Sequence, residues 1–145
     1  MKVSTLAEGL GFTEGPTVLS SGEIIAVSID QKRVYRLGAD GVSIAGEPGG
    51  GPNGATANDA DTIFLAQNGG NWMRNPSPEI KEEGMTGGVQ RIHESTVSWV
   101  TRDPLAPNDI CFGPDGNLYV TDPTRDGKYD DGRIWRCDPE TGASE

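Results

Sequence analysis

The sequence predicts an all-β fold, a β-propeller of about three four-stranded blades. Three observations lead to this prediction. A 15-residue block occurs three times, an apolar run containing an arginine follows each copy, and short apolar segments are separated by Gly, Pro, Asn and Asp. Four short strands repeating about every 40–55 residues are typical of propeller blades.

The repeated block comprises residues 14–28, 53–67 and 108–122. Each copy begins with a polar residue, Glu14, Asn53 or Asn108, which we call the head of the block. A short apolar stretch, a polar turn, four mainly apolar residues and a polar end follow. In the third copy the turn is Gly-Pro-Asp-Gly, in which proline fixes φ and glycine accepts a positive φ. Each block therefore predicts two antiparallel strands.

A third strand is predicted after each block, at residues 34–37, 89–92 and 134–137. Its pattern is apolar, variable, arginine, apolar, and a turn follows. We expect Arg36, Arg91 and Arg136 to face solvent while their stems cover apolar surface. A fourth strand is predicted at residues 42–44 and 97–100, whereas the third copy reaches Glu145 before its fourth strand.

We therefore predict a single, partial propeller domain over residues 1–145, with blade units at about 10–52, 53–104 and 105–145. The first two heads are 53 − 14 = 39 residues apart and the next two are 108 − 53 = 55 apart. The excess defines an insertion loop at residues 71–87. Long insertions in repeat proteins form loops on one face, often over the functional site.

Three blades cannot close a ring, because propellers have four to eight. An open stack would expose two apolar flanks. Three arrangements stay open: this is half of a longer protein, two copies close a six-bladed ring, or another chain supplies the missing half. Residues 1–9, with Val3 and Leu6, could also add an outer strand to a blade.

The composition argues against several classes of partner. The formal net charge is −10 and there is no basic stripe, so we expect neither nucleic acid nor anionic lipid as a partner. No run of 18 apolar residues and no apolar leader is visible, so we expect no membrane segment. Cys111 and Cys137 lie in apolar strand contexts, and we expect free, buried thiols in a cytoplasmic protein.

The three heads are candidate site residues. Inner strands of a propeller line the central channel, so Glu14, Asn53 and Asn108 should converge at one mouth. Carboxylate and amide oxygens suit Ca²⁺ better than Zn²⁺, which prefers His or Cys. The alternative is that these side chains only bond nearby backbone at the strand starts. The single histidine, His93, is expected at the surface, which disfavours a His-dependent mechanism.

Two motifs resemble a known family. The motifs are Phe-Thr-Glu-Gly-Pro at residues 12–16 and Pro-Asn-Asp at 107–109, the latter followed by Pro-Asp-Gly-Asn-Leu-Tyr-Val-Thr-Asp-Pro at 114–123. Together they resemble the SMP-30/gluconolactonase/luciferin-regenerating-enzyme family, over nearly the whole chain but only about half of a family member. A non-lactonase propeller, such as a strictosidine-synthase-like protein, would not need both motifs.

The resemblance implies a six-bladed propeller that holds one divalent metal, probably Ca²⁺, and hydrolyses a small-molecule lactone of sugar-acid or related type. It implies that Glu14 and Asn108 bind the metal, and we place Asn53, Asn108, Asp109 and Asp122 along the substrate channel. The catalytic residues stay unknown, because the family's general-base aspartate and a further asparagine ligand belong to later blades. Ala106 stands where family members often carry a substrate-binding arginine.

The sequence therefore leaves two functions open. The first is the N-terminal half of a lactonase, active once the missing half completes the site. The second is a non-catalytic propeller fragment or scaffold, which forms a homodimer or pairs with a second half-propeller chain.

Overall fold

The computed structural model describes residues 2–70, 83–123 and 132–145. Within these ranges every regular element is a strand, which confirms the all-β prediction. No described segment forms a helix that could cross a lipid bilayer. Residues 71–82 of the predicted insertion lie outside the described ranges, and its last residue, Gly87, begins a strand.

The strands form three antiparallel sheets in which sequence neighbours are also neighbours in space. The first sheet contains β1 (Thr13–Val18), β2 (Ile24–Ser28), β3 (Arg33–Gly38) and β4 (Gly41–Gly46). The second contains β5 (Pro52–Ala57), β6 (Ile63–Asn68), β7 (Gly87–His93) and β8 (Thr96–Thr101). The third contains β9 (Ile110–Phe112), β10 (Leu118–Asp122) and β11 (Arg133–Cys137).

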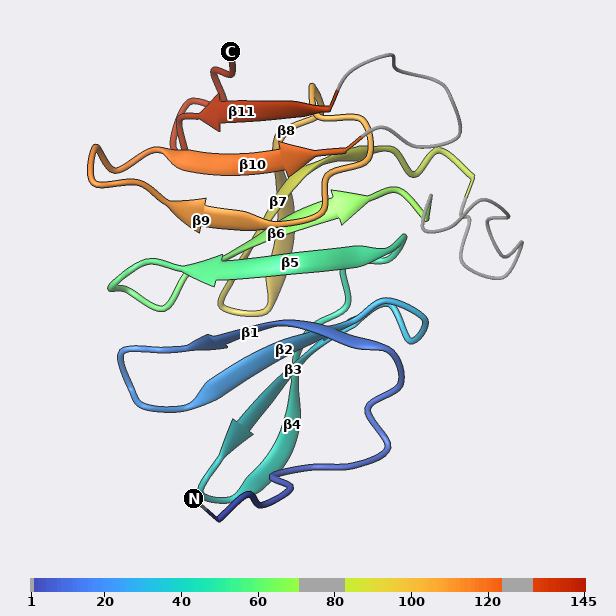
Figure 1. Cartoon of the computed structure of the whole chain (residues 1–145), viewed down its shortest axis with the longest axis vertical. Coiled ribbons are helices and arrows are strands. Elements are labelled where there is room, and N and C mark those ends of the chain that lie inside the picture. The colour runs from blue at the N-terminus through green and yellow to red at the C-terminus, as the bar shows by residue number, and fades with distance from the viewer. Residues whose placement is uncertain (1, 71–82, 124–131) are drawn as a thin grey trace.

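The sheets are stacked as three successive blades of a β-propeller (Figure 1). Their first strands lie next to one another, β1 beside β5 and β5 beside β9. The third blade also begins its fourth strand, because Ser144 forms a bridge with Cys137 in β11. By contrast, residues 2–11 contain no strand, so the outer strand considered for residues 1–9 does not form within the described part of that segment.

Two apolar cores join the blades. Between the first and second blades, Ile25 and Val27 of β2 pack with Ile63 and Leu65 of β6. Between the second and third, Phe64 and Ala66 of β6 pack with Leu118 and Val120 of β10. Successive strand residues point to opposite faces, so β6 packs against the first blade with one set of residues and against the third blade with the other.

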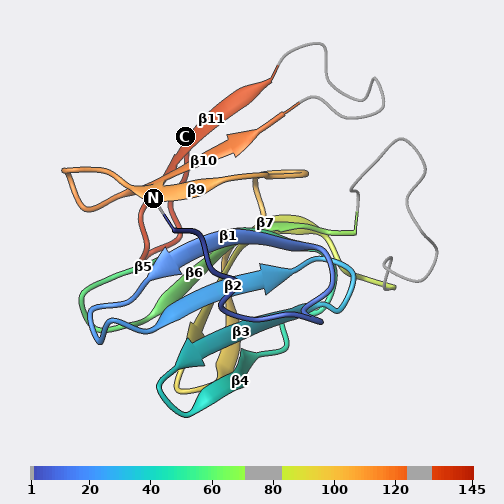
Figure 2. The ribbon, with the colours of Figure 1, turned by 60° about the horizontal axis from the view of Figure 1, so that its bottom comes forward.

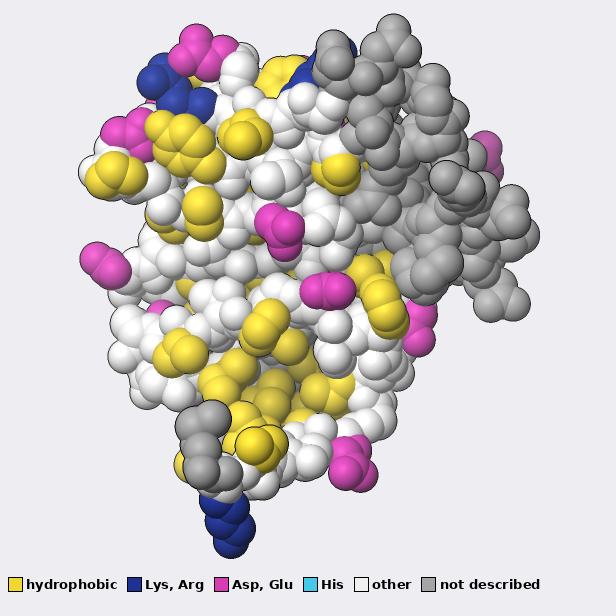
Figure 3. Space-filling model, in the orientation of Figure 1, with side chains coloured by type: hydrophobic (Ala, Val, Ile, Leu, Met, Phe, Trp, Pro, Cys, Tyr) yellow, Lys and Arg dark blue, Asp and Glu magenta, His cyan; other side chains and the backbone are white. Residues whose placement is uncertain are grey.

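This alternation leaves one face of each end blade open. On the first sheet the open face carries Val18, Val42 and Ile44, which are 70%, 47% and 47% exposed. The side chain of Leu6 lies over this face, beside Ile24 and Leu37. Figure 2 turns the first sheet toward the viewer, and Figure 3 shows apolar side chains gathered over it.

The open face of the third blade corrects the prediction for the cysteines. Cys137 is buried but Cys111 is exposed. Cys111 pairs with Tyr119 in β10, a residue that alternates with the core residues Leu118 and Val120. Cys111 therefore lies on the face that no described blade covers, and an apolar strand context could not reveal which of its faces is packed.

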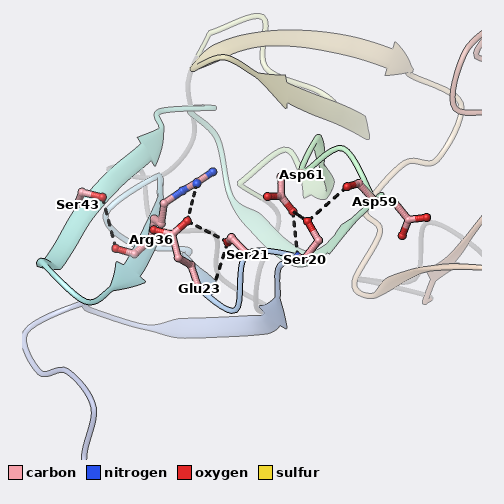
Figure 4. A network of polar contacts seen from close by, with 7 residues as sticks. All are labelled: Ser20, Ser21, Glu23, Arg36, Ser43, Asp59 and Asp61. Carbon is pink, nitrogen blue, oxygen red and sulfur yellow. Dashed lines mark hydrogen bonds and ion pairs between the residues drawn. The ribbon is translucent and has the colours of Figure 1, made fainter.

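Polar contacts also join the first two blades (Figure 4). The turn after β1 reaches the turn before β6: the Ser20 N–H and hydroxyl donate to Asp61 Oδ1 at 3.0 and 2.8 Å. Thr17 Oγ1 donates to the Ala55 carbonyl at 2.8 Å. On the same side of the first blade, Arg36 pairs with Glu23 at 2.9 Å. The Ser20 and Thr17 bonds thus connect adjacent blades, whereas the Arg36–Glu23 pair lies within the first blade.

Candidate functional site

The three heads occupy equivalent places at the starts of the innermost strands. Glu14 is the second residue of β1, Asn53 is the second residue of β5, and Asn108 lies two residues before β9. The ladder is irregular between Glu14 and Thr17 and again between Pro52 and Gly54. Such bulges bend a strand and redirect its side chains, and they are common near functional sites.

Glycines allow the inner strands to approach closely beside the heads. A Cβ on Gly15 would lie 2.6 Å from the Ala55 nitrogen and 3.1 Å from the Asn53 carbonyl oxygen. A Cβ on Gly54 would lie 2.7 Å from the Asn108 carbonyl oxygen and 2.8 Å from the Asp109 Cα. Each glycine directly follows a head, so the backbones of the three heads are stacked as neighbours.

The side chains of the second and third heads are directly bonded. Asn53 Nδ2 donates to Asn108 Oδ1 at 2.7 Å, and Asn108 Nδ2 donates to Asp109 Oδ2 at 2.9 Å. Asn53 is 6% exposed, Asn108 is half-buried and Asp109 is exposed. The row therefore runs from a buried amide to a carboxylate at the surface, and its order of donors fixes the orientation of both amides.

Backbone bonds hold the third head against β10. The Asn108 N–H donates to the Thr121 carbonyl at 2.8 Å, and the Thr121 N–H donates to the Asp109 carbonyl at 3.0 Å. The Asp109 N–H also donates to Thr121 Oγ1 at 2.9 Å. Asn108 and Asp109 thus extend the β9–β10 pairing although they lie outside the assigned strand.

Asp122, which we placed along the channel, is a buried carboxylate with 2% exposure. Its Oδ1 accepts from the Ala106 N–H, and its Oδ2 accepts from the Leu105 N–H, both at 2.9 Å. Trp135 Nε1 also donates to Oδ2, at 3.1 Å. These bonds connect Asp122 to the loop that leads to Asn108, a link that the sequence analysis missed.

Glu14 is exposed in β1, one residue before the glycine that packs on Asn53 and Ala55. The structure thus brings Asn53, Asn108 and Asp109 together and places Glu14 on the adjacent strand, while Asp122 supports the group from inside the third blade. His93 is exposed at the end of β7, where its Nδ1 lies 3.0 Å from Thr62 Oγ1, and it takes no part in this row.

The donor chemistry of the row suits a hard divalent cation. Glu14 and Asp109 offer carboxylate oxygens, and Asn53 and Asn108 offer amide oxygens. The number of donors is small for Ca²⁺, which takes six to eight oxygen ligands. Among the residues that the structure describes, no group of three or more His, Cys, Asp or Glu side chains could hold a metal ion. The four named donors therefore suit a cation by type but are fewer than the six to eight ligands that Ca²⁺ takes.

Comparison with known proteins places the chain in context. Residues 12–145 match the family model described as "SMP-30/Gluconolactonase/LRE-like region". No curated protein matches the chain by sequence.

Several solved structures have the same fold. A gluconolactonase from Xanthomonas campestris is 16% identical, with a TM-score of 0.72, over 97% of this chain and 48% of its own. A virginiamycin B lyase from Staphylococcus aureus is 17% identical, with a TM-score of 0.68, over 98% and 43%. A luciferin-regenerating enzyme is 15% identical, with a TM-score of 0.63, over 93% and 47%. The chain thus spans about half the length of these proteins, and the likeness concerns the fold.

Proposed function

Because the chain belongs to the SMP-30/gluconolactonase/LRE-like family, we propose that it forms half of a lactonase-type hydrolase that acts on a small-molecule lactone of sugar-acid type with a divalent cation, Ca²⁺. The observation that carries this proposal is the row of oriented polar side chains at the inner-strand heads, Asn53–Asn108–Asp109, with Glu14 on the adjacent strand.

Glu14 and Asn108 are the residues that would hold the cation. When bound, a divalent cation polarises an ester carbonyl and makes bound water more acidic. The chain's own part is binding and orientation. Asn53 holds Asn108 Oδ1 and Asp109 holds Asn108 Nδ2, so the Asn108 amide meets a ligand in one fixed orientation. Orientation of this kind lowers the barrier because less freedom is lost on reaction.

This proposal requires further blades, because the four donors are fewer than Ca²⁺ takes and no general base is assigned within the chain. A second copy of the chain or a second half-propeller would supply them. The apolar open face of the first blade supports such a partner, because Val18, Val42 and Ile44 would be covered by an adjacent blade (Figure 3).

The test combines Ca²⁺ calorimetry with lactone hydrolysis followed by pH-stat. We expect the 145-residue chain to bind Ca²⁺ weakly. We expect Glu14→Gln to abolish this binding while Glu47→Gln, an exposed control in the same blade, leaves it unchanged. The chain alone should hydrolyse a gluconolactone slowly. Equal Ca²⁺ binding by Glu14→Gln and wild type, or rapid Ca²⁺-independent turnover, would contradict the proposal.

The second candidate function is a non-catalytic scaffold that self-associates through the same open face. Sedimentation equilibrium separates the physical forms. A dimer without Ca²⁺ binding or turnover supports the scaffold, whereas a dimer with both supports a site completed by a second copy. A stable monomer contradicts self-association and leaves a second half-propeller chain as the partner to test.

A further inference from the structure

One backbone group is held in the same way in all three blades: the N–H two residues before each head. In the first blade the Phe12 N–H donates to Asp30 Oδ1 at 2.7 Å. In the second the Gly51 N–H donates to Gln67 Oε1 at 2.6 Å, and in the third the Ala106 N–H donates to Asp122 Oδ1 at 2.9 Å. A side chain near the end of the second strand therefore anchors the loop that leads to each head.

The acceptors differ in sequence but serve one place in the repeat. Gln67 and Asp122 both lie 14 residues after their heads. Ser28 occupies this position in the first blade, and its hydroxyl donates to Asp30 Oδ1 at 3.0 Å, so the acceptor there has moved two residues along the chain. Recurrence with two kinds of side chain, Asp and Gln, at two positions of the repeat indicates that the bond itself is needed where each inner strand begins.

The third blade relies on this bond more than the other two. In the first and second blades the residue 15 positions after the head donates to the carbonyl of the same loop residue: Ile29 N–H to Phe12 and Asn68 N–H to Gly51, both at 3.0 Å. The equivalent residue in the third blade is Pro123, which has no N–H. The second bond cannot form there, and Asp122 instead binds two consecutive loop N–H groups, those of Leu105 and Ala106.

We propose that Asp122 is a positioning residue for Asn108: its buried carboxylate fixes residues 105 and 106 and so sets the Asn108 amide against Asn53 and Asp109. Pro107 alone separates the anchored Ala106 from Asn108, so a shift of the loop passes directly to the head. Hydrogen bonds to a carboxylate are stronger than those between neutral groups. The inference rests on the proposed function only for the use of Asn108; the anchoring itself does not depend on a cation or a lactone.

The experiment is nuclear magnetic resonance of the 145-residue chain without added metal, comparing wild type with Asp122→Asn. The probes are the side-chain NH₂ signals of Asn53 and Asn108 and the exchange rates of the Leu105 and Ala106 amide protons. We expect at least a tenfold faster exchange of one or both amides, together with displaced Asn108 and Asn53 signals. Asp115→Asn is the matched control, because Asp115 is an exposed carboxylate in the turn before β10, and both sets of probes should stay unchanged.

Two more variants separate positioning from general stability. Trp135→Phe removes only the third donor to Asp122, so it should lower stability while the Asn108 signals stay in place. Pro123→Ala restores the N–H that the other blades use, so the double variant with Asp122→Asn should recover part of the wild-type Asn108 signals. If Asp122→Asn alone does not fold, the double variant takes its place, and its Leu105 amide should still exchange faster than in wild type, because the restored N–H would bond the Ala106 carbonyl and not the Leu105 N–H.

The inference is overturned if Asp122→Asn folds and leaves the Asn108 and Asn53 signals unchanged, or if Trp135→Phe displaces them equally. Unchanged exchange of the Leu105 and Ala106 amides in Asp122→Asn, or of the Leu105 amide in the double variant, would overturn it as well. Displaced signals in Asp122→Asn combined with an absence of Ca²⁺ binding in wild type would refute the proposed function and leave the positioning role intact.

Discussion

Replacing Gly54 with alanine should force the second and third blades apart beside the heads. The new Cβ would lie 2.7 Å from the Asn108 carbonyl oxygen, 2.8 Å from the Asp109 Cα and 3.1 Å from the Ile110 nitrogen. Ordinary contacts between carbon atoms are about 3.5–4.0 Å. All three neighbours are backbone atoms, so no side chain can rotate away and β9 itself must move.

The expected size of the effect follows from two opposing contributions. Overpacking of this kind costs about 1–3 kcal/mol, and contact with backbone places Gly54→Ala near the upper limit. Alanine restricts the unfolded chain and returns about 0.4–1 kcal/mol, because the φ of Gly54 is not positive. The net loss is therefore about 2 kcal/mol, which lowers the urea midpoint by roughly 1 M for a slope of about 2 kcal/mol per M.

The assay is urea unfolding combined with the Asn53 and Asn108 side-chain signals, and the control is Gly116→Ala. Gly116 has φ +80° and no atom near its Cβ, so that variant suffers backbone strain of about 1–2 kcal/mol without contact. Both variants should lose stability, but only Gly54→Ala should displace the Asn signals. A Gly54→Ala variant with stability within about 0.5 kcal/mol of wild type and unmoved signals would refute the close approach of β5 and β9.

Three further predictions concern other parts of the blades. Burial raises the pKa of Asp30, but hydrogen bonds from backbone and hydroxyl groups outweigh it and lower the pKa below 3.8. The stabilisation that ionised Asp30 contributes to the fold is thus present above pH 3.8 and is lost as the pH falls through the lower pKa of the folded state. Asp30→Asn should therefore flatten the acid limb of a stability–pH curve. Iodoacetamide at neutral pH should modify Cys111 and spare Cys137, whose pKa burial and the charge of Asp103 raise to about 11; equal labelling in mass spectra would be inconsistent with the fold. Ser20→Ala should cost about 0.5–1.5 kcal/mol in thermal unfolding by removing the hydroxyl bond to Asp61, and no loss would show that this bond adds nothing.

The fold could be predicted from the sequence because each copy of the repeat carries the same physical determinants of a blade. A polar head, a turn and an alternating apolar run recur at fixed spacing, and the residues at the second strand positions, such as Ile63 and Phe64, pack toward opposite neighbours. The exposure of Cys111 could not be predicted in the same way. The alternation of side chains along a strand shows that the sheet has two faces, but not which face another blade covers. That depends on how many blades surround the sheet.

The site was only partly predictable for a related reason. The heads could be found from the repeat, but the bond between Asn53 and Asn108 depends on the stagger of two strands that are 55 residues apart in sequence. The glycines after two of the heads were a usable signal for close approach. The polar residues 14 positions after the heads were a second signal, since Gln67 and Asp122 are buried acceptors at the end of an apolar strand, where an unbonded polar group would be costly.

The residue after the third head breaks the glycine pattern, and this bears on how a ring can be completed. Gly15 faces the second inner strand and Gly54 faces the third, each without a side chain. The residue at the equivalent position, directly after the third head, is Asp109, whose carboxylate accepts a hydrogen bond from the Asn108 amide. An inner strand packed beside β9 as β9 is packed beside β5 would meet this side chain instead of a hydrogen atom. While Asp109 keeps this position, such a strand cannot approach β9 as closely as β9 approaches β5. We therefore expect a completed ring to be more open beside Asn108, where the proposed cation and lactone would require room.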